Sequence, residues 1–401
     1  MKSSRISTFI IFIGMAIACS LLSSQVTVLA QNQSVNPLAN NITPKDPVIP
    51  LGYGRRALSS FEKYRIEKTI SELRQSAAVE WEQDNQDEAF TLWYRQLKLI
   101  RTLDREAEIV ALGDVGAIAW ESNRKEDVRN IAERLTTLEA ELKNTKSSEL
   151  LKLLLTAYRQ IGYLDRAIEV QNKIIIASRR TDNYSQKVEQ ANLEILGELY
   201  LNSFDYQNAA EIYQSLLSQS DAKTLASAPQ REQYLKTLIE IYDRTAKTES
   251  AIEAKQRLAE YYAVTDKTSR IPALKIAIAR DYETLNQLPQ AIDIYEETWQ
   301  QAEKLQKLAI ADSALSSLGK IYQNTAQTDQ AIAAYNNLIE IQKQSYNYYG
   351  LINTYDILGQ IYLKSNQKSQ AQQSFQQALE LGRSLNYKTD YFNRQLKQLA
   401  E

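Results

Sequence analysis

A pattern of small and aromatic residues recurs along this chain of 401 residues at intervals of about forty. Its clearest copy begins at Leu318-Gly319, continues through Tyr322, and reaches Ala331 and Tyr335. Two further close copies begin at Leu196-Gly197 and Leu358-Gly359. A fixed spacing of this kind indicates an array of structural repeats rather than one globular core.

Looser copies of the pattern fill the intervals between the close ones. We call the position that the small residue holds in the close copies the anchor, and it falls at 77, 116, 155, 197, 239, 279, 319 and 359, with Leu155 and Ile239 at two of these positions. Successive anchors lie 39, 39, 42, 42, 40, 40 and 40 residues apart. The spacing therefore predicts eight repeats.

The residue types in each copy suit a pair of packed helices. Apolar positions recur three and four residues apart, which is the spacing of one helix face. A small anchor on one helix and an Ala on the next allow the two helices to approach closely. We expect the tyrosine three residues after the anchor, such as Tyr322, to fill the gap where the following helix crosses. A single hairpin cannot bury its apolar face, so the repeats should be stable only as a stack.

The pattern Leu-Gly-x-x-Tyr, followed by Ala, Tyr or Phe, and Ala or Leu, resembles the tetratricopeptide repeat. The resemblance covers roughly residues 58–401. It implies an all-α, right-handed superhelical solenoid of about eight helix-turn-helix repeats. Two features depart from the family pattern: the period is near forty rather than thirty-four, and most copies lack the proline that usually closes a repeat.

Residues 1–30 read as a secretory signal peptide. Lys2 and Arg5 precede an apolar run over residues 9–18, and Val28-Leu29-Ala30 offers small residues at the two positions that a signal peptidase reads. We expect cleavage between Ala30 and Gln31, and an exported, periplasmic or secreted protein. Two alternatives stay open: an uncleaved membrane anchor over residues 6–22, and a lipoprotein modified at Cys19.

Residues 31–57 read as a flexible linker ahead of the repeat domain at 58–401. Four of the seven prolines lie here, among Asn, Gln and Ser, and the segment shows no helical periodicity. Proline fixes φ and removes a backbone donor, so the segment should be extended.

Composition argues against several classes of protein. Without the leader the chain carries 45 basic and 49 acidic residues with no basic stripe, which does not favour nucleic acid as a partner. Histidine is absent and Cys19 is the one cysteine. Histidine-dependent catalytic triads and the usual zinc, copper and haem ligands are therefore missing. We expect neither an enzyme nor a bound cofactor.

The resemblance implies that the first helix of each repeat lines a concave groove. The groove candidates are Trp81, Trp120, Arg74, Lys152, Arg159, Glu198, Asn202, Lys236, Glu240, Arg280, Lys320 and Asn324. Each polar member could equally form an ion pair within the array, and each tryptophan could pack against neighbouring helices. Thr156, Glu198 and Glu240 stand where a carboxylate-clamp repeat would have asparagine. A free C-terminal carboxylate is therefore not a favoured ligand for this face.

One group of carboxylates has spacings that could suit a hard metal ion. Glu194 and Glu198 are four residues apart, and Glu240 and Asp243 are three apart, so each pair shares one helix face. Oxygen ligands would favour Ca²⁺ or Mn²⁺. The alternative is that Lys236 and Arg244 neutralise the group, and this reading is preferred.

These observations favour an exported scaffold that holds a peptide or a protein partner in a concave face. One alternative is a periplasmic assembly factor for a photosynthetic complex, because the chain is similar in size, leader and repeat content to an exported tetratricopeptide protein of photosystem II assembly that carries manganese. Another is a solenoid that spaces other components without a ligand. A contact with a membrane is expected only if the leader is retained or Cys19 is lipidated.

Overall fold

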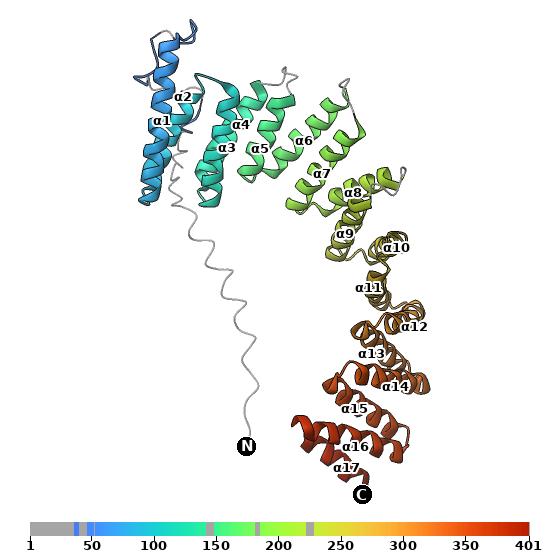
Figure 1. Cartoon of the computed structure of the whole chain (residues 1–401). Helices are drawn as coiled ribbons and strands as arrows, with labels where there is room; N and C mark the ends of the chain where they lie inside the picture. The colour runs from blue at the N-terminus through green and yellow to red at the C-terminus, as the bar shows by residue number, and fades with distance from the viewer. Residues whose placement is uncertain are drawn as a thin grey trace, which may run out of the picture. The chain divides into compact units, whose positions relative to one another are not determined.

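The computed structural model describes residues 36–39, 46–51, 53–141, 148–180, 185–221 and 228–400. The leader at 1–30 and part of the linker lie outside these residues. Within them the chain forms seventeen α-helices and one short 3₁₀ helix (Figure 1). No helix among the described residues is both long enough and apolar enough to span a bilayer.

The chain divides into two compact units, residues 1–163 and 164–401. The first unit contains α1 (Ser60–Glu82), α2 (Gln86–Ile100), α3 (Arg105–Glu121), α4 (Lys125–Glu141) and α5 (Ser148–Gln160). The second contains α6 (Leu164–Ser178), α7 (Gln186–Asn202), α8 (Tyr206–Asp221), α9 (Ala228–Arg244), α10 (Thr248–Val264), η2 (Thr268–Arg270), α11 (Ile271–Thr284), α12 (Leu288–Lys304), α13 (Leu308–Asn324), α14 (Thr328–Gln344), α15 (Tyr348–Lys364), α16 (Lys368–Leu385) and α17 (Thr389–Ala400).

All eight predicted anchors lie on the odd-numbered helices α1 to α15, so each repeat begins with an odd-numbered helix and α17 follows the last repeat. In the first unit α1 packs against α2 and α3 against α4, and in the second unit each helix from α7 packs against the next. The prediction of an all-α stack of helical hairpins is confirmed.

An aromatic ring over a small residue closes several hairpins. A Cβ placed on Gly319 would lie 2.6 Å from the ring of Tyr335, and one on Gly359 would lie 2.6 Å from the ring of Phe375. Both distances are too short for real contacts, so glycine is required for this approach of the two helices. The ring stands sixteen residues after the anchor, and we call that place the ring position.

The side chain at the ring position also contacts the end of the first helix of its hairpin. The hydroxyl of Tyr295 donates to Glu283 at 2.5 Å, and Tyr335 lies 3.4 Å from the side-chain oxygen of Gln323. The alanine four residues before the ring, Ala291 or Ala331, is fully buried in these repeats, as expected for the Ala that faces a small anchor. The hairpins of Tyr295 and Tyr335 are thus each held by one apolar contact and one polar contact at the edge.

The tyrosine three residues after the anchor packs in the opposite direction from the one expected. The Tyr322 hydroxyl donates to Glu296 on the preceding helix α12 at 2.6 Å, and the Tyr242 hydroxyl accepts from Gln214 on the preceding helix α8 at 2.6 Å. The expectation that it fills the gap at the following helix was wrong. Tyr242 turns this way although Ile239 and Lys255 hold the anchor and ring positions of its repeat, so the direction does not depend on a small anchor.

Identical turns explain the period of forty in the second unit. From Ala246 to Asn386 a residue in the left-handed region of φ recurs every twenty positions, at 246, 266, 286, 306, 326, 346, 366 and 386. Between these turns most helices are seventeen residues long, as α12 to α15 are. Two such helices and two three-residue turns make forty residues. This added length, rather than a looser packing, accounts for the departure from the thirty-four-residue family period.

Replacing Ala331 by Leu should test the hairpin packing. Ala331 is fully buried on α14, and extra methylenes in a packed contact cost about 1–3 kcal/mol. We therefore expect a lower midpoint of thermal unfolding. Ala333, two residues on, is exposed, so Ala333→Leu is the matched control and should change the free energy of unfolding by less than about 0.5 kcal/mol. Equal melting of the two variants would contradict the assigned packing.

Candidate functional site

The predicted polar residues of the first-helix surface are all exposed. Arg74 lies on α1, Lys152 and Arg159 lie on α5, and the others lie on α7, α9, α11 and α13. In the second unit Glu198, Glu240, Arg280 and Lys320 stand one residue after the anchor and Asn202 and Asn324 stand five after it, whereas Lys236 stands three before it. The positions one and five residues after the anchor are one helical turn apart and share a face. Within each unit, we call these exposed positions of the odd-numbered helices the first-helix face.

Several members of this face are engaged in local ion pairs. Lys152 lies 3.2 Å from Glu149 and Glu240 lies 2.8 Å from Arg244, with both pairs solvent-exposed. Arg280 donates to the hydroxyl of Ser313 at 3.0 Å. Exposed pairs within one helix contribute only a few tenths of a kcal/mol, so they leave these side chains available to a partner.

The two predicted tryptophans have different surroundings. Trp81 on α1 is half-buried, with its ring centroid 5.6 Å from that of Trp93 and 6.1 Å from that of Phe90 on α2. Trp120 on α3 is 55 % exposed. Its indole covers the turn at Gly162, where a Cβ would lie 2.7 Å from the ring. Trp81 is therefore part of the packing of its hairpin, whereas Trp120 presents half of its surface to solvent.

The carboxylates considered for a metal are separated by other contacts. Glu194 accepts from the hydroxyl of Tyr234 on α9, and Asp243 lies 2.8 Å from Lys255. Glu240 pairs with Arg244 on its own helix. Within the described part of the chain, no three carboxylates, histidines or cysteines are grouped so that they could hold a metal ion.

Lys236 belongs to a compact charge cluster at the start of α9. The carboxylate of Glu232, itself 8 % exposed, lies 2.6 Å from the ammonium of Lys236, 2.6 Å from that of Lys267 and 2.9 Å from the guanidinium of Arg270. Burial alone would raise the pKa of Glu232, but hydrogen bonds from Lys236, Lys267 and Tyr262 lower it to about 2. The cluster ties α9 to the end of α10 and to η2.

Replacing Glu232 by Gln should remove the acid-sensitive part of this link. A carboxyl whose pKa is lowered by folding stabilises the fold above its unfolded value and loses that contribution as the pH falls through its folded value. We expect the parent protein to lose stability between about pH 5 and pH 2, with the variant losing less across that window. At pH 7 the variant should be less stable by about 1–3 kcal/mol. Urea unfolding at several pH values measures both effects, and parallel pH profiles would contradict the assignment.

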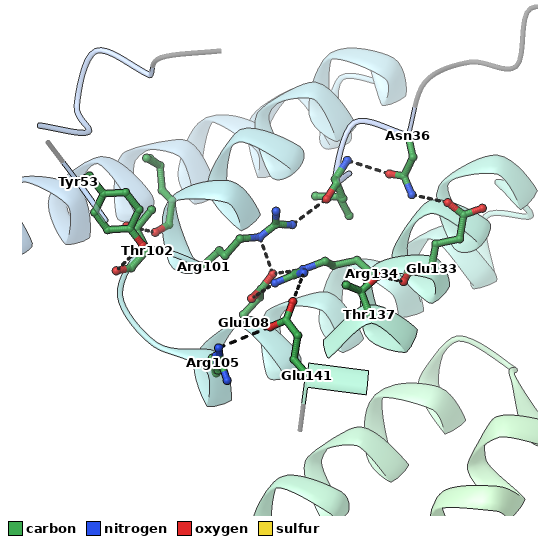
Figure 2. A network of polar contacts seen from close by, with 12 residues as sticks. Asn36, Tyr53, Arg101, Thr102, Arg105, Glu108, Glu133, Arg134, Thr137 and Glu141 are labelled. Atoms are coloured by element: carbon green, nitrogen blue, oxygen red, sulfur yellow. Dashed lines mark hydrogen bonds and ion pairs between the residues drawn. The ribbon is translucent and has the colours of Figure 1, made fainter. Parts of the chain in front are cut away.

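A buried ion-pair network lies in the first unit (Figure 2). Glu108 on α3, 1 % exposed, lies 2.7 Å from Arg134 on α4 and 2.9 Å from Arg101 at the end of α2. Arg101 also donates to the carbonyl oxygen of Leu38 at 2.9 Å. Burial of the Arg101 guanidinium, together with the charge of Arg134, lowers its pKa. The network holds three helices together and places the described linker residues against them.

The described linker residues form one wall of a cavity of about 870 Å³ along α2. Pro47, Ile49, Pro50, Leu51 and Tyr53 line this wall, and Arg124 and Asp127 at the start of α4 lie on another side. Helix α2 contributes the floor with Asp87, Phe90, Thr91, Tyr94, Arg95 and Lys98. Linker residue Asp46 pairs with Arg95 at 2.8 Å, which fixes the wall to the floor. We call this cavity the α2 trough.

The sequence alone did not predict the α2 trough. The sequence of α2 does contain a polar stripe. Its members recur three and four residues apart, at Asp87, Thr91, Arg95 and Lys98. Such a stripe is usually a solvated face. Nothing in the sequence indicates that the proline-rich segment at 46–53 lies beside it, since that contact joins residues about fifty positions apart.

Comparison with known proteins identifies a repeat family in the second unit. The sequence model of the tetratricopeptide repeat matches residues 310–384, which run from α13 to α16. No curated protein matches the chain in sequence.

Three of the similar solved structures have less than 20 % sequence identity to this chain. BtubC from P. vanneervenii is 18 % identical over 56 % of this chain and 92 % of its own, with a TM-score of 0.36. The C-terminal part of a tetratricopeptide repeat protein from Cytophaga hutchinsonii is 14 % identical over 67 % and 95 %, with a TM-score of 0.37. The quorum sensor NprR from B. thuringiensis is 17 % identical over 74 % and 81 %, with a TM-score of 0.32.

Proposed function

We propose that this chain is a non-catalytic, exported scaffold that binds a protein or peptide partner on its first-helix face. The chain carries tetratricopeptide repeats, and this module typically binds proteins or peptides. One observation supports this proposal above the others: polar side chains of both signs remain exposed at the same two turns of successive first helices. Core packing determines the residue types at the helix positions between these two. The two exposed positions are not constrained in this way and can serve recognition of a partner.

The composition of the face favours an extended partner. Along α7, α9, α11 and α13 the exposed residue just after the anchor is acidic in the first two helices and basic in the next two, at Glu198, Glu240, Arg280 and Lys320. No single sign dominates, so a partner of mixed charge fits better than a polyanion or a polycation. Charges at such an exposed face contribute mainly to specificity and to the rate of association.

Photo-crosslinking should locate the partner on this face. A benzophenone amino acid placed at Lys320 or Asn324 on α13 should capture the partner from the exported fraction. The same residue at the exposed positions Ala333 and Asn336 on α14 is the matched control, because these positions lie on a second helix. Capture at the α14 positions alone would overturn the proposal, and capture at none of the four would favour a solenoid that acts only as a spacer.

Trp120 offers a second, energetic test. Exposed aromatic side chains often dominate binding free energy, so Trp120→Ala should weaken partner binding by about 2 kcal/mol with little change in helical content. Trp299 on α12 packs partly against the core of the second unit, and Trp299→Ala should leave binding near that of the parent. Isothermal titration of the captured partner compares the two. Loss of folding in Trp120→Ala would show that the indole serves packing.

Export is supported by the leader pattern at residues 1–30. We expect the mature protein to begin at Gln31, because Val28-Leu29-Ala30 provides the cleavage signal. N-terminal sequencing of the protein from the exported fraction measures this directly. A chain that retains residues 9–18 would instead be membrane-anchored, and one that begins at a lipidated Cys19 would be a lipoprotein.

A further inference from the structure

The α2 trough has the dimensions of a ligand site. Its volume of about 870 Å³ lies within the range of about 300–1,000 Å³ that is usual for small-molecule pockets. From Asp87 to Lys98 its floor follows about 16 Å of helix. The trough is therefore elongated, and it suits a chain-like molecule better than a compact one.

The charges of the trough are paired except at one place. Arg95 pairs with Asp46 at 2.8 Å, and Arg124 pairs with Asp87 at 2.8 Å and with Asp127 at 2.6 Å. Arg101 is held by Glu108 at 2.9 Å. These guanidinium groups already have carboxylate partners in the protein. A multiply charged phosphate group would lie beside those carboxylates without matching positive charge.

Lys98 is the exception in the part of the chain that the structure describes. Its side chain is half-buried and lines the trough, yet it forms no hydrogen bond or ion pair with any described residue. Burial and the neighbouring Arg101 lower the pKa of its ammonium group, and Asp46 offsets part of that effect. A half-buried ammonium without a partner is stabilised by one additional negative charge.

The wall opposite α2 is apolar and incompletely covered. Pro47, Ile49, Pro50 and Leu51 line it, and Leu51 is 86 % exposed. On the floor, the guanidinium of Arg124 lies over the ring of Phe90, 4.4 Å from the ring centroid. An apolar ligand lying between this wall and the floor would remove Leu51 from water.

We propose that the α2 trough binds the carboxylate end of an elongated apolar chain, with the carboxylate at Lys98 and the chain between the proline-rich wall and α2. A fatty acid and the C-terminal segment of an apolar peptide share this chemistry. The site lies on second helix α2 and on the start of α4, so it is separate from the first-helix face and does not depend on the proposed scaffold function.

Isothermal titration of the full chain with paired probes tests the proposal. One arm uses octanoate against octanamide, and the other uses an acetylated apolar pentapeptide with a free C-terminal carboxylate against its C-terminal amide. We expect at least one carboxylate probe to bind, and its amide counterpart to bind about tenfold more weakly or worse, because the charge-assisted contact is lost. The arm with the tighter carboxylate identifies the source of the ligand.

Variants place the carboxylate within the trough. Lys98→Gln should weaken binding of the carboxylate probe about tenfold or more and leave binding of its amide unchanged. Lys68 on α1 is exposed and pairs with Glu72 at 3.8 Å, so Lys68→Gln is the matched control and should bind like the parent. Leu51→Ser should weaken binding of carboxylate and amide alike, because it alters the apolar wall.

Three results would overturn the proposal: no binding of any probe at millimolar concentration, equal binding of carboxylate and amide, or undiminished carboxylate binding by Lys98→Gln. Circular dichroism of each variant establishes that it is folded. If Lys98→Gln does not fold, the comparison of carboxylate with amide in the parent and the loss of binding in Leu51→Ser decide the question.

Discussion

The contact between the anchor and the ring position is the constraint on which the rest of the second unit depends. Only a small residue at Gly319 or Gly359 lets the facing ring of Tyr335 or Phe375 approach. That approach sets how closely the two helices of a hairpin pack. The tyrosine three residues after the anchor then joins the hairpin to the previous repeat, as Tyr322 does through Glu296.

One repeat of the second unit departs from this contact, with Ile239 at the anchor position and a charged side chain in place of the ring. Lys255 stands sixteen residues after the anchor position 239, and it is 5 % exposed. Its ammonium lies 2.8 Å from Asp243 on α9 and 2.7 Å from Asp281 on α11. Burial by itself lowers the pKa of Lys255, but the hydrogen bonds that its ammonium donates to the two carboxylates outweigh burial and raise the pKa. The contact with Asp243 has the same placement as that of Tyr295 with Glu283, so a polar link at the hairpin edge is kept while the ring is lost.

The first unit is held in a different way. Its cohesion relies on the buried Glu108, which lies between Arg101 and Arg134 (Figure 2). Linker residues also bond to these helices, and the carbonyl oxygen of Leu38 accepts a hydrogen bond from Arg101. Removing one partner of such a buried network typically costs several kcal/mol, because the others are left charged and unpaired. The segment ahead of α1 is thus part of the structure of this unit at Asn36, Leu38 and Asp46, and the α2 trough exists because that segment lies there.

The sequence by itself determined the number of repeats, the helix that carries each anchor and the exposure of the polar first-helix positions. These follow from spacings within one helix or between two consecutive helices, where geometry is nearly invariant. Tertiary structure alone decided the direction in which Tyr322 packs, the partners of Lys255, the packing of Trp81 against Trp93, and the presence of a trough beside Lys98. Each of these features depends on which side chains of other helices or of the linker pack against a given helix. Periodicity along one helix does not identify those neighbouring side chains.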